Sequence, residues 1–219
     1  MTARTYDLIA FDWDGTLFDS TAAIARSIQL AVADVGGTVP SDEQASYVIG
    51  MALMPALAHA APDVPQARYN DLANRYRYHY LQQQERVTLF AGVLEMLQAL
   101  RERGHWLAVA TGKSRRGLNE ALQQAQLRGV FDSSRTADET AGKPHPLMLQ
   151  ELMAELDVSP QRVLMVGDTT HDLQMARNAG CASVAVAYGA HEVAHLQDCA
   201  PLHIAHDVAD LQRWLLAHG

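Results

Sequence analysis

A short apolar segment lies at residues 6–13, and from residue 89 onward short and long apolar segments alternate along the chain. The short apolar runs end abruptly in polar residues or glycine, which is typical of buried strands. Strands are expected at residues 6–13, 105–112, 133–138, 162–168, 182–189 and 202–206. Between them, apolar residues recur at spacings of three and four, which predicts amphipathic helices. The helices are expected at residues 92–104, 114–127, 145–157, 170–180 and 208–219. This alternation predicts an α/β fold, with a parallel sheet core and helices on both of its faces.

The section that follows the first strand has a different pattern, without a predicted strand. Asp19 or Ser20 is expected to cap its first helix, and the pattern stays helical throughout residues 41–86. A long helical section between two strands of one sheet indicates a small α-helical domain inserted into the core. The core is expected at residues 1–18 and 89–219, and the inserted domain at residues 19–88.

Composition and charge narrow the class of protein. Of the 219 residues, 48% are hydrophobic and 19% are charged, which is ordinary for a globular protein. The net charge of -8 argues against nucleic-acid binding, which favours a basic surface. Cys181 and Cys199 form no CxxC pair, and no segment resembles a signal peptide or a membrane span. We therefore expect a cytoplasmic protein that binds neither nucleic acid nor membrane, as a monomer or a homodimer.

Polar residues at the expected strand ends are the candidate functional residues. Ligands of open parallel sheets bind beyond the carboxyl ends of the strands, so side chains from distant parts of the sequence meet there. Carboxylates follow two of the strands, a hydroxyl and a glycine end a third, and a lysine precedes a helix. The candidates are Asp12, Asp14, Thr111, Gly112, Lys143, Asp168 and Asp172.

This set of side chains suits phosphoryl transfer to water or to another acceptor. Several carboxylates repel one another unless a cation lies among them, and oxygen ligands are those that Mg²⁺ prefers. The cation and a lysine neutralise a phosphate, while a hydroxyl and backbone N–H groups hold its oxygens. One carboxylate is then able to attack phosphorus, and a second to move the proton of the leaving oxygen.

Four short motifs resemble those of the haloacid dehalogenase superfamily. They are "DWDGT", "VATGKS", "GKPHP" and "VGDTTHD", which occur in the family's order and span nearly the whole chain. The resemblance implies a Rossmann-like core with an inserted helical cap. It also implies a Mg²⁺-dependent reaction on a small phosphorylated substrate. Asp12 is then the nucleophile, and Asp14 is the general acid and base.

The resemblance assigns roles to the other motif residues as well. Three of them hold the phosphoryl group: Thr111, Gly112 through its N–H, and Lys143. Four carry the metal: Asp12, Asp14 through its backbone carbonyl, Asp168, and Asp172 directly or through water.

Within the superfamily, the sequences of the motifs most resemble those of the phosphoglycolate phosphatase-like phosphatases. The expected reaction is hydrolysis of a phosphoglycolate-like phosphomonoester through an aspartyl-phosphate. Two alternatives stay open: a phosphotransferase or mutase similar to β-phosphoglucomutase, and a non-catalytic protein that binds a phosphometabolite. Residues 51–54 of the expected cap, Met-Ala-Leu-Met, lack the arginine that such mutases carry in this region.

Several residues near the motifs have no role that the sequence assigns. Lys113, Arg115 and Arg116 either add positive potential near a phosphate or start a solvated helix. The Trp13 side chain is expected to point away from the two flanking aspartates. The tyrosines of residues 69–80 have helical spacing, which favours a packed stripe over a nucleic-acid surface.

Overall fold

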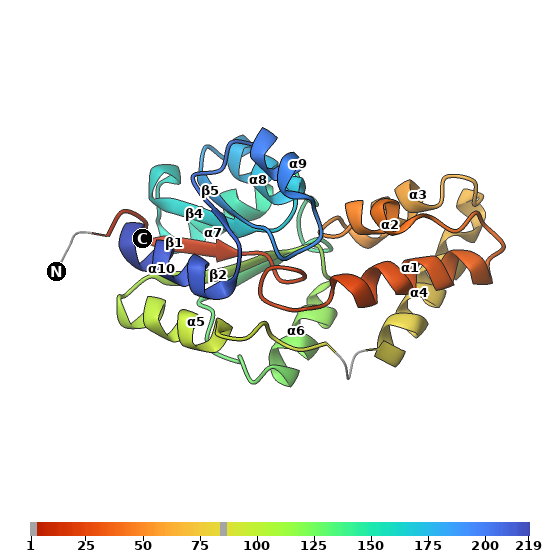
Figure 1. Cartoon of the computed structure of the whole chain (residues 1–219), viewed down its shortest axis with the longest axis horizontal. Coiled ribbons are helices and arrows are strands. Elements are labelled where there is room, and N and C mark those ends of the chain that lie inside the picture. Colours follow the sequence, from red (N-terminus) through yellow and green to blue (C-terminus); the bar gives the residue numbers. More distant parts are fainter. Residues whose placement is uncertain (1–3, 84–86) are drawn as a thin grey trace.

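In the computed structural model, which describes residues 4–83 and 87–219, six parallel strands form one sheet in the order β3-β2-β1-β4-β5-β6. The first strand of the chain lies inside the sheet, between β2 and β4 (Figure 1). The strands are β1 (Leu8–Phe11), β2 (Trp106–Thr111), β3 (Ser133–Thr136), β4 (Val163–Gly167), β5 (Ala182–Val186) and β6 (Ile204–Ala205). The predicted α/β class and parallel sheet are confirmed.

Helices cover both faces of the sheet because the central strands are apolar on both sides. In β1, Ile9 and Phe11 face one apolar cluster, and Leu8 and Ala10 face another. The first cluster is closed by α5 (Val93–Glu102), α6 (Arg115–Gln124) and α10 (Val208–His218). The second is closed by α7 (Leu147–Leu156) and α8 (Thr170–Asn178), and α9 (Val193–Asp198) packs near β6. The sheet is therefore fixed between two helical layers, with its strand ends free to carry a site.

Four of the helices between β1 and β2 extend to one side of this core and have an apolar cluster of their own (Figure 1). They are α1 (Thr21–Asp34), α2 (Asp42–Tyr47), α3 (Leu53–Ala60) and α4 (Tyr69–Gln83), with a short 3₁₀ turn at Gln66–Arg68. Helices α1 and α4 lie side by side, and we call all four the cap helices. The exact division of the chain at residues 18/19 and 88/89 stays a prediction.

The prediction of helix throughout residues 41–86 was wrong in one respect, because two breaks interrupt it. Residues 48–52 separate α2 from α3, and residues 61–65 separate α3 from the 3₁₀ turn. At the first break, Gly50 has a φ of +87°, a left-handed conformation that glycine adopts without strain. The break matters because it turns residues 50–52 toward the core. Residues 84–86 lie outside the described part of the chain.

Within the described residues, no helix combines the length and the apolar character that crossing a membrane requires.

Candidate active site

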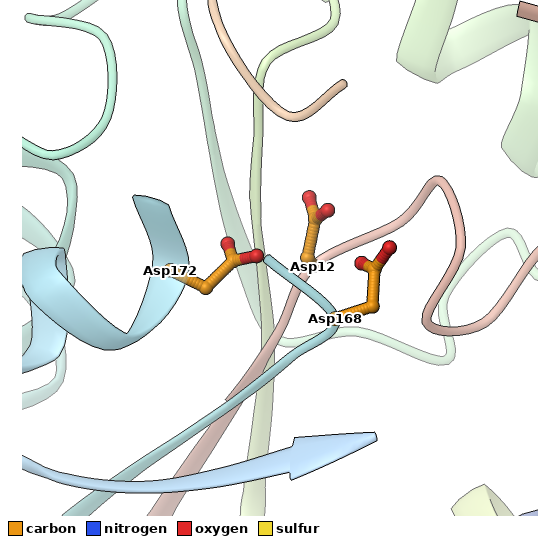
Figure 2. Close-up of side chains that lie close together, drawn as sticks. All are labelled: Asp12, Asp168 and Asp172. Carbon is orange, nitrogen blue, oxygen red and sulfur yellow. The ribbon is translucent and has the colours of Figure 1, made fainter. Parts of the chain in front are cut away.

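Carboxylates from β1, β4 and α8 meet at one end of the sheet (Figure 2). Asp12 directly follows β1 and Asp168 directly follows β4, and these two strands are neighbours. Asp172 comes from the first turn of α8, which begins just beyond Asp168. Each residue offers one carboxylate oxygen to a group in which all three atoms lie within 4.8 Å of one another. All three residues are fully buried.

Lys143 supplies positive charge to this group. Its Nζ lies 2.6 Å from Asp12 Oδ1 and 2.6 Å from Asp172 Oδ1, and its side chain is fully buried. Burial lowers the pKa of Lys143, but the two carboxylates more than offset this and raise it above its ordinary value. The ammonium therefore stays charged at neutral pH.

One lysine does not neutralise three buried carboxylates. Burial raises the pKa of Asp12 well above its ordinary range, with the Asp172 and Asp168 charges acting in the same direction against the pull of Lys143. Burial, together with Asp172, also raises the pKa of Asp168 to about 7. Such shifts mark a place where negative charge is concentrated without full compensation.

The donors around these carboxylates leave room for a cation. The hydroxyl of Thr16 and the N–H of Ala190 each donate to one oxygen of Asp168, at 2.8 Å. By contrast, apart from the Lys143 ammonium, no hydroxyl or N–H in the described part of the chain donates to either oxygen of Asp12 or to Asp172 Oδ1. Oxygen atoms from three carboxylates, buried and short of positive charge, form a donor set that fits Mg²⁺.

Gly15 allows the first-strand loop to approach this group closely. Its φ is +82°, and a Cβ on this residue would lie only 2.1 Å from Asp168 Oδ2. Any larger residue at position 15 would therefore push the loop that follows β1 away from Asp168.

Asp14 is close to the cluster in sequence but has different partners. Ser20 Oγ donates to Asp14 Oδ1 at 2.7 Å, and Lys113 Nζ lies 3.0 Å from Asp14 Oδ2. Ser20 is the residue before α1, as expected, but its hydroxyl bonds Asp14 and makes no capping bond to the helix. The two aspartates thus have separate environments, one beside Lys143 and one beside Lys113.

The remaining motif residues lie on β2 and just beyond it. Thr111 ends β2 and is buried, and its hydroxyl accepts a hydrogen bond from the Lys113 N–H at 3.2 Å. Gly112 follows it at the point where residues 50–52, which connect α2 to α3, meet the core. A Cβ on Gly112 would lie 2.5 Å from the carbonyl oxygens of both Gly50 and Met51. The cap therefore rests directly on the strand end that carries Thr111.

This contact gives a prediction for Gly112→Ala. The added methyl meets backbone atoms of the cap, which cannot swing aside as a side chain can, so the cap must shift away from the strand end. Misplacement on the ångström scale lowers catalytic efficiency by about 100-fold, and we expect a loss of this size in kcat/KM. Steady-state phosphate release measures it.

Gly117→Ala is the matched control. Gly117 lies in α6, where an added Cβ meets only Ser114 Oγ at 3.4 Å, an ordinary contact. We expect it to retain activity and to gain about 0.5–1 kcal/mol of unfolding free energy, since alanine favours a helix. Equal activity of Gly112→Ala and Gly117→Ala would contradict the close contact.

A second contact between cap and core involves two histidines. His171 and His191 each donate an Nε2–H to the backbone carbonyl oxygen of Tyr47, the last residue of α2, at 2.9 and 3.0 Å. The Tyr47 ring stacks on His191, with ring centroids 5.4 Å apart. The sequence gave no sign of Tyr47 as a partner of either histidine.

The structure separates the basic residues that the sequence left unassigned. Arg115 pairs with Glu139 at 2.6 Å, and Arg116 pairs with Glu120 at 2.9 Å on the surface. Lys113 alone of the three faces the candidate site. Trp13 is fully buried and stacks on Phe18, with ring centroids 5.2 Å apart, so its side chain lies in the core.

A parallel sheet with a buried carboxylate cluster and a lysine at its strand ends suits a hydrolase that acts on phosphate groups. The family model for haloacid dehalogenase-like hydrolases matches residues 9–186, and the chain belongs to this family. The phosphoglycolate phosphatase of Aliivibrio fischeri is 33% identical over 96% of this chain and 95% of its own length. A 5'-nucleotidase of Pseudomonas aeruginosa is 30% identical over 99% and 98% of the two chains.

A solved structure extends the likeness to the whole fold. The structure of a predicted phosphoglycolate phosphatase from Haemophilus somnus matches with a TM-score of 0.84 and 26% identity, and covers 96% of this chain and 98% of its own. Together the comparisons identify the chain as a phosphoric monoester hydrolase similar to phosphoglycolate phosphatases.

Proposed function

We propose that the chain is a Mg²⁺-dependent phosphatase that hydrolyses a small phosphoglycolate-like phosphomonoester through an aspartyl-phosphate on Asp12. The observation that carries the proposal is the state of the Asp12 carboxylate. It is buried, Lys143 Nζ lies 2.6 Å from its Oδ1 as counter-charge, and no other donor of the described residues forms a hydrogen bond to its oxygens. A carboxylate with free lone pairs in a water-poor site is suited to attack phosphorus.

The reaction divides into two steps that use the two aspartates differently. In the first, an Asp12 oxygen forms a bond to phosphorus as the bond to the ester oxygen breaks, and Asp14 gives its proton to that oxygen. In the second, Asp14 takes a proton from a water molecule whose oxygen attacks the same phosphorus. The Asp12–phosphate bond then breaks, which releases inorganic phosphate and restores both carboxyl groups.

Thr111, Gly112 and Lys143 are the residues that we propose to hold the phosphoryl oxygens. Asp12, Asp168, Asp172 and the Asp14 backbone carbonyl are the proposed Mg²⁺ ligands. Mg²⁺ bound among them supplies positive charge that offsets the charge of the phosphoryl oxygens. The Lys143 ammonium adds a second fixed charge on the side of Asp172, at 2.6 Å from its Oδ1.

The substrate class is proposed from the position of the cap. Residues 50–52 lie against Gly112 and close to Gly142, where a Cβ would meet the Ala52 Cβ at 3.2 Å. This arrangement favours a small leaving group. The apolar Met51–Met54 segment offers no basic side chain for a second phosphate, which disfavours the mutase alternative.

Phosphate release from a panel of phosphometabolites tests the proposal. The panel includes 2-phosphoglycolate, a nucleoside 5'-monophosphate, pyrophosphate and a sugar phosphate, each with Mg²⁺ and with EDTA. We expect Mg²⁺-dependent release, with preference for a small ester. An isomerised sugar phosphate without free phosphate would support the mutase, and binding without turnover would support the non-catalytic alternative.

A further inference from the structure

The sequence contains two lysines, and both lie beside the candidate site, Lys143 buried and Lys113 half-buried. Lys143 lies among the carboxylates of the cluster. Lys113 lies beside Asp14: 13% of its side chain is exposed, and its Nζ is 3.0 Å from Asp14 Oδ2. The proposed mechanism gives Lys143 a task and gives Lys113 none.

Lys113 is also in contact with the cap. Its Nζ donates to the Tyr80 hydroxyl at 3.3 Å and lies 5.0 Å from the centre of the Tyr80 ring. Tyr80 belongs to α4, and the Tyr76 ring stacks beside it with centroids 5.9 Å apart. The ammonium therefore lies where the core, the cap and the proposed proton-transfer residue meet.

The charge on Lys113 is permanent under ordinary conditions. A lysine side chain is ordinarily protonated at neutral pH, and the Asp14 carboxylate lies 3.0 Å from its Nζ as counter-charge. In the described part of the chain, Asp14 is the one carboxylate within ion-pair distance of Lys113. The proposed mechanism directs that carboxylate to the ester oxygen, so another anion is needed to partner the lysine.

We propose that Lys113, with Tyr80 as its partner from the cap, binds a carboxylate on the leaving group and so selects phosphorylated hydroxy acids. This inference rests on the proposed function and adds the specificity-determining residues to it. Lys113 is next to Asp14, so the bound carboxylate lies within a few bonds of the ester oxygen. A single ammonium matches the single charge of a carboxylate better than the double charge of a second phosphate.

The same geometry links substrate binding to the cap. A carboxylate held by the Lys113 ammonium and the Tyr80 hydroxyl contacts the core and the cap at once. Charge-assisted hydrogen bonds of this kind are stronger than those between neutral groups. The correct leaving group therefore helps to hold α4 against the core while the reaction proceeds.

Two esters of matched shape test this inference. In 2-phosphoglycolate the leaving group carries a carboxylate, and in 2-hydroxyethyl phosphate a neutral CH₂OH group takes its place. We expect Lys113→Met to lower kcat/KM for 2-phosphoglycolate by about 10- to 100-fold, the range for loss of a hydrogen bond to a charged group. The neutral ester shares any loss that comes from removing the ion-pair partner of Asp14, but its loss should be at least about threefold smaller, because no charge is left unpartnered on the ligand.

Two further variants complete the test, one with an expected partial loss and one as a surface control. Tyr80→Phe keeps the ring and removes one hydroxyl, so we expect a loss of about threefold to tenfold that is again confined to 2-phosphoglycolate. Arg116→Met removes a cation from a surface side chain that is 89% exposed. It should change kcat/KM for neither of the two esters.

Equal losses on both esters, or no loss on either, would overturn the role of Lys113. Preference for pyrophosphate that Lys113→Met abolishes would identify a phosphate as the anion and overturn the carboxylate assignment. Calorimetric titration of Asp12→Asn with each ester separates this inference from the proposed function, since it requires no turnover. In the Asp12→Asn background, Lys113→Met should weaken binding of 2-phosphoglycolate but not of 2-hydroxyethyl phosphate. This holds even if the wild-type chain releases no phosphate. Equal affinities before and after the lysine is replaced would contradict the inference.

Discussion

Asp12→Asn should abolish phosphate release while the protein stays folded. The amide has no anionic oxygen to attack phosphorus, so the covalent step is lost. Removal of a group central to hydrolysis costs about 10⁴-fold or more in kcat in well-characterised hydrolases, and we expect a loss on this scale. Release of phosphate from 2-phosphoglycolate with saturating Mg²⁺ measures it, and an intact-mass measurement excludes deamidation back to aspartate.

The stability of this variant should not fall with its activity. Asp12 is a buried carboxylate whose pKa burial raises, so its charged form is unfavourable in the folded protein at neutral pH. A neutral amide relieves repulsion from Asp168 and Asp172, and the unfolding free energy should be unchanged or higher. Urea denaturation without Mg²⁺ measures it.

Asp19→Asn is the matched control in the same loop, because Asp19 is exposed and its N–H, which the substitution keeps, makes its backbone bond to Thr88. It should retain activity and stability. Substantial turnover by Asp12→Asn, with the deamidated form excluded, would overturn the covalent mechanism.

The sequence predicted the core of this fold because two simple physical rules apply there. A strand buried on both faces reads as a short apolar run, as in Leu8–Phe11. Neighbouring parallel strands end at the same edge, so polar residues after β1, β2 and β4 had to meet. The proximity of Asp12 to Asp168 follows from these rules, although their functional roles stay predictions.

The contacts that the sequence did not reveal join residues far apart in the chain. The pair of Lys113 with Tyr80 depends on where α4 lies relative to β2, and no local pattern encodes that. The helical spacing of Tyr69, Tyr76 and Tyr80 predicted packing, and these rings do pack against the cap's apolar cluster, but the Tyr80 ring also faces Lys113. The break at residues 48–52 was missed although Gly50 lies in it, because Met51 and Ala52 favour a helix and the contact of Gly50 and Met51 with Gly112 competes with that preference.

Lys143→Met should destabilise the protein more than any surface charge substitution. The methionine fills a similar volume but leaves Asp12 and Asp172 without their shared counter-charge in a fully buried site. Breaking a buried ion pair by removing one partner costs about 3–5 kcal/mol of unfolding free energy, and we expect a loss in this range at pH 8 without divalent cation. Denaturant unfolding measures it, with Arg116→Met as the surface control.

The pH dependence and the Mg²⁺ dependence of this loss identify its electrostatic origin. The folded-state pKa values of Asp12 and Asp168 are raised, the latter to about 7, and removal of a cation raises them further. A carboxyl group with a raised pKa in the folded state destabilises the protein above that pKa, and this cost disappears as pH falls toward the unfolded-state value. The deficit of Lys143→Met should therefore shrink between pH 8 and pH 5, and Mg²⁺ at pH 8 should also reduce it, because a cation among the carboxylates replaces part of the lost charge. A deficit that stays constant with pH and with Mg²⁺ would mean that Lys143 acts through packing, and the carboxylate cluster would then not be the charged site that the proposed chemistry requires.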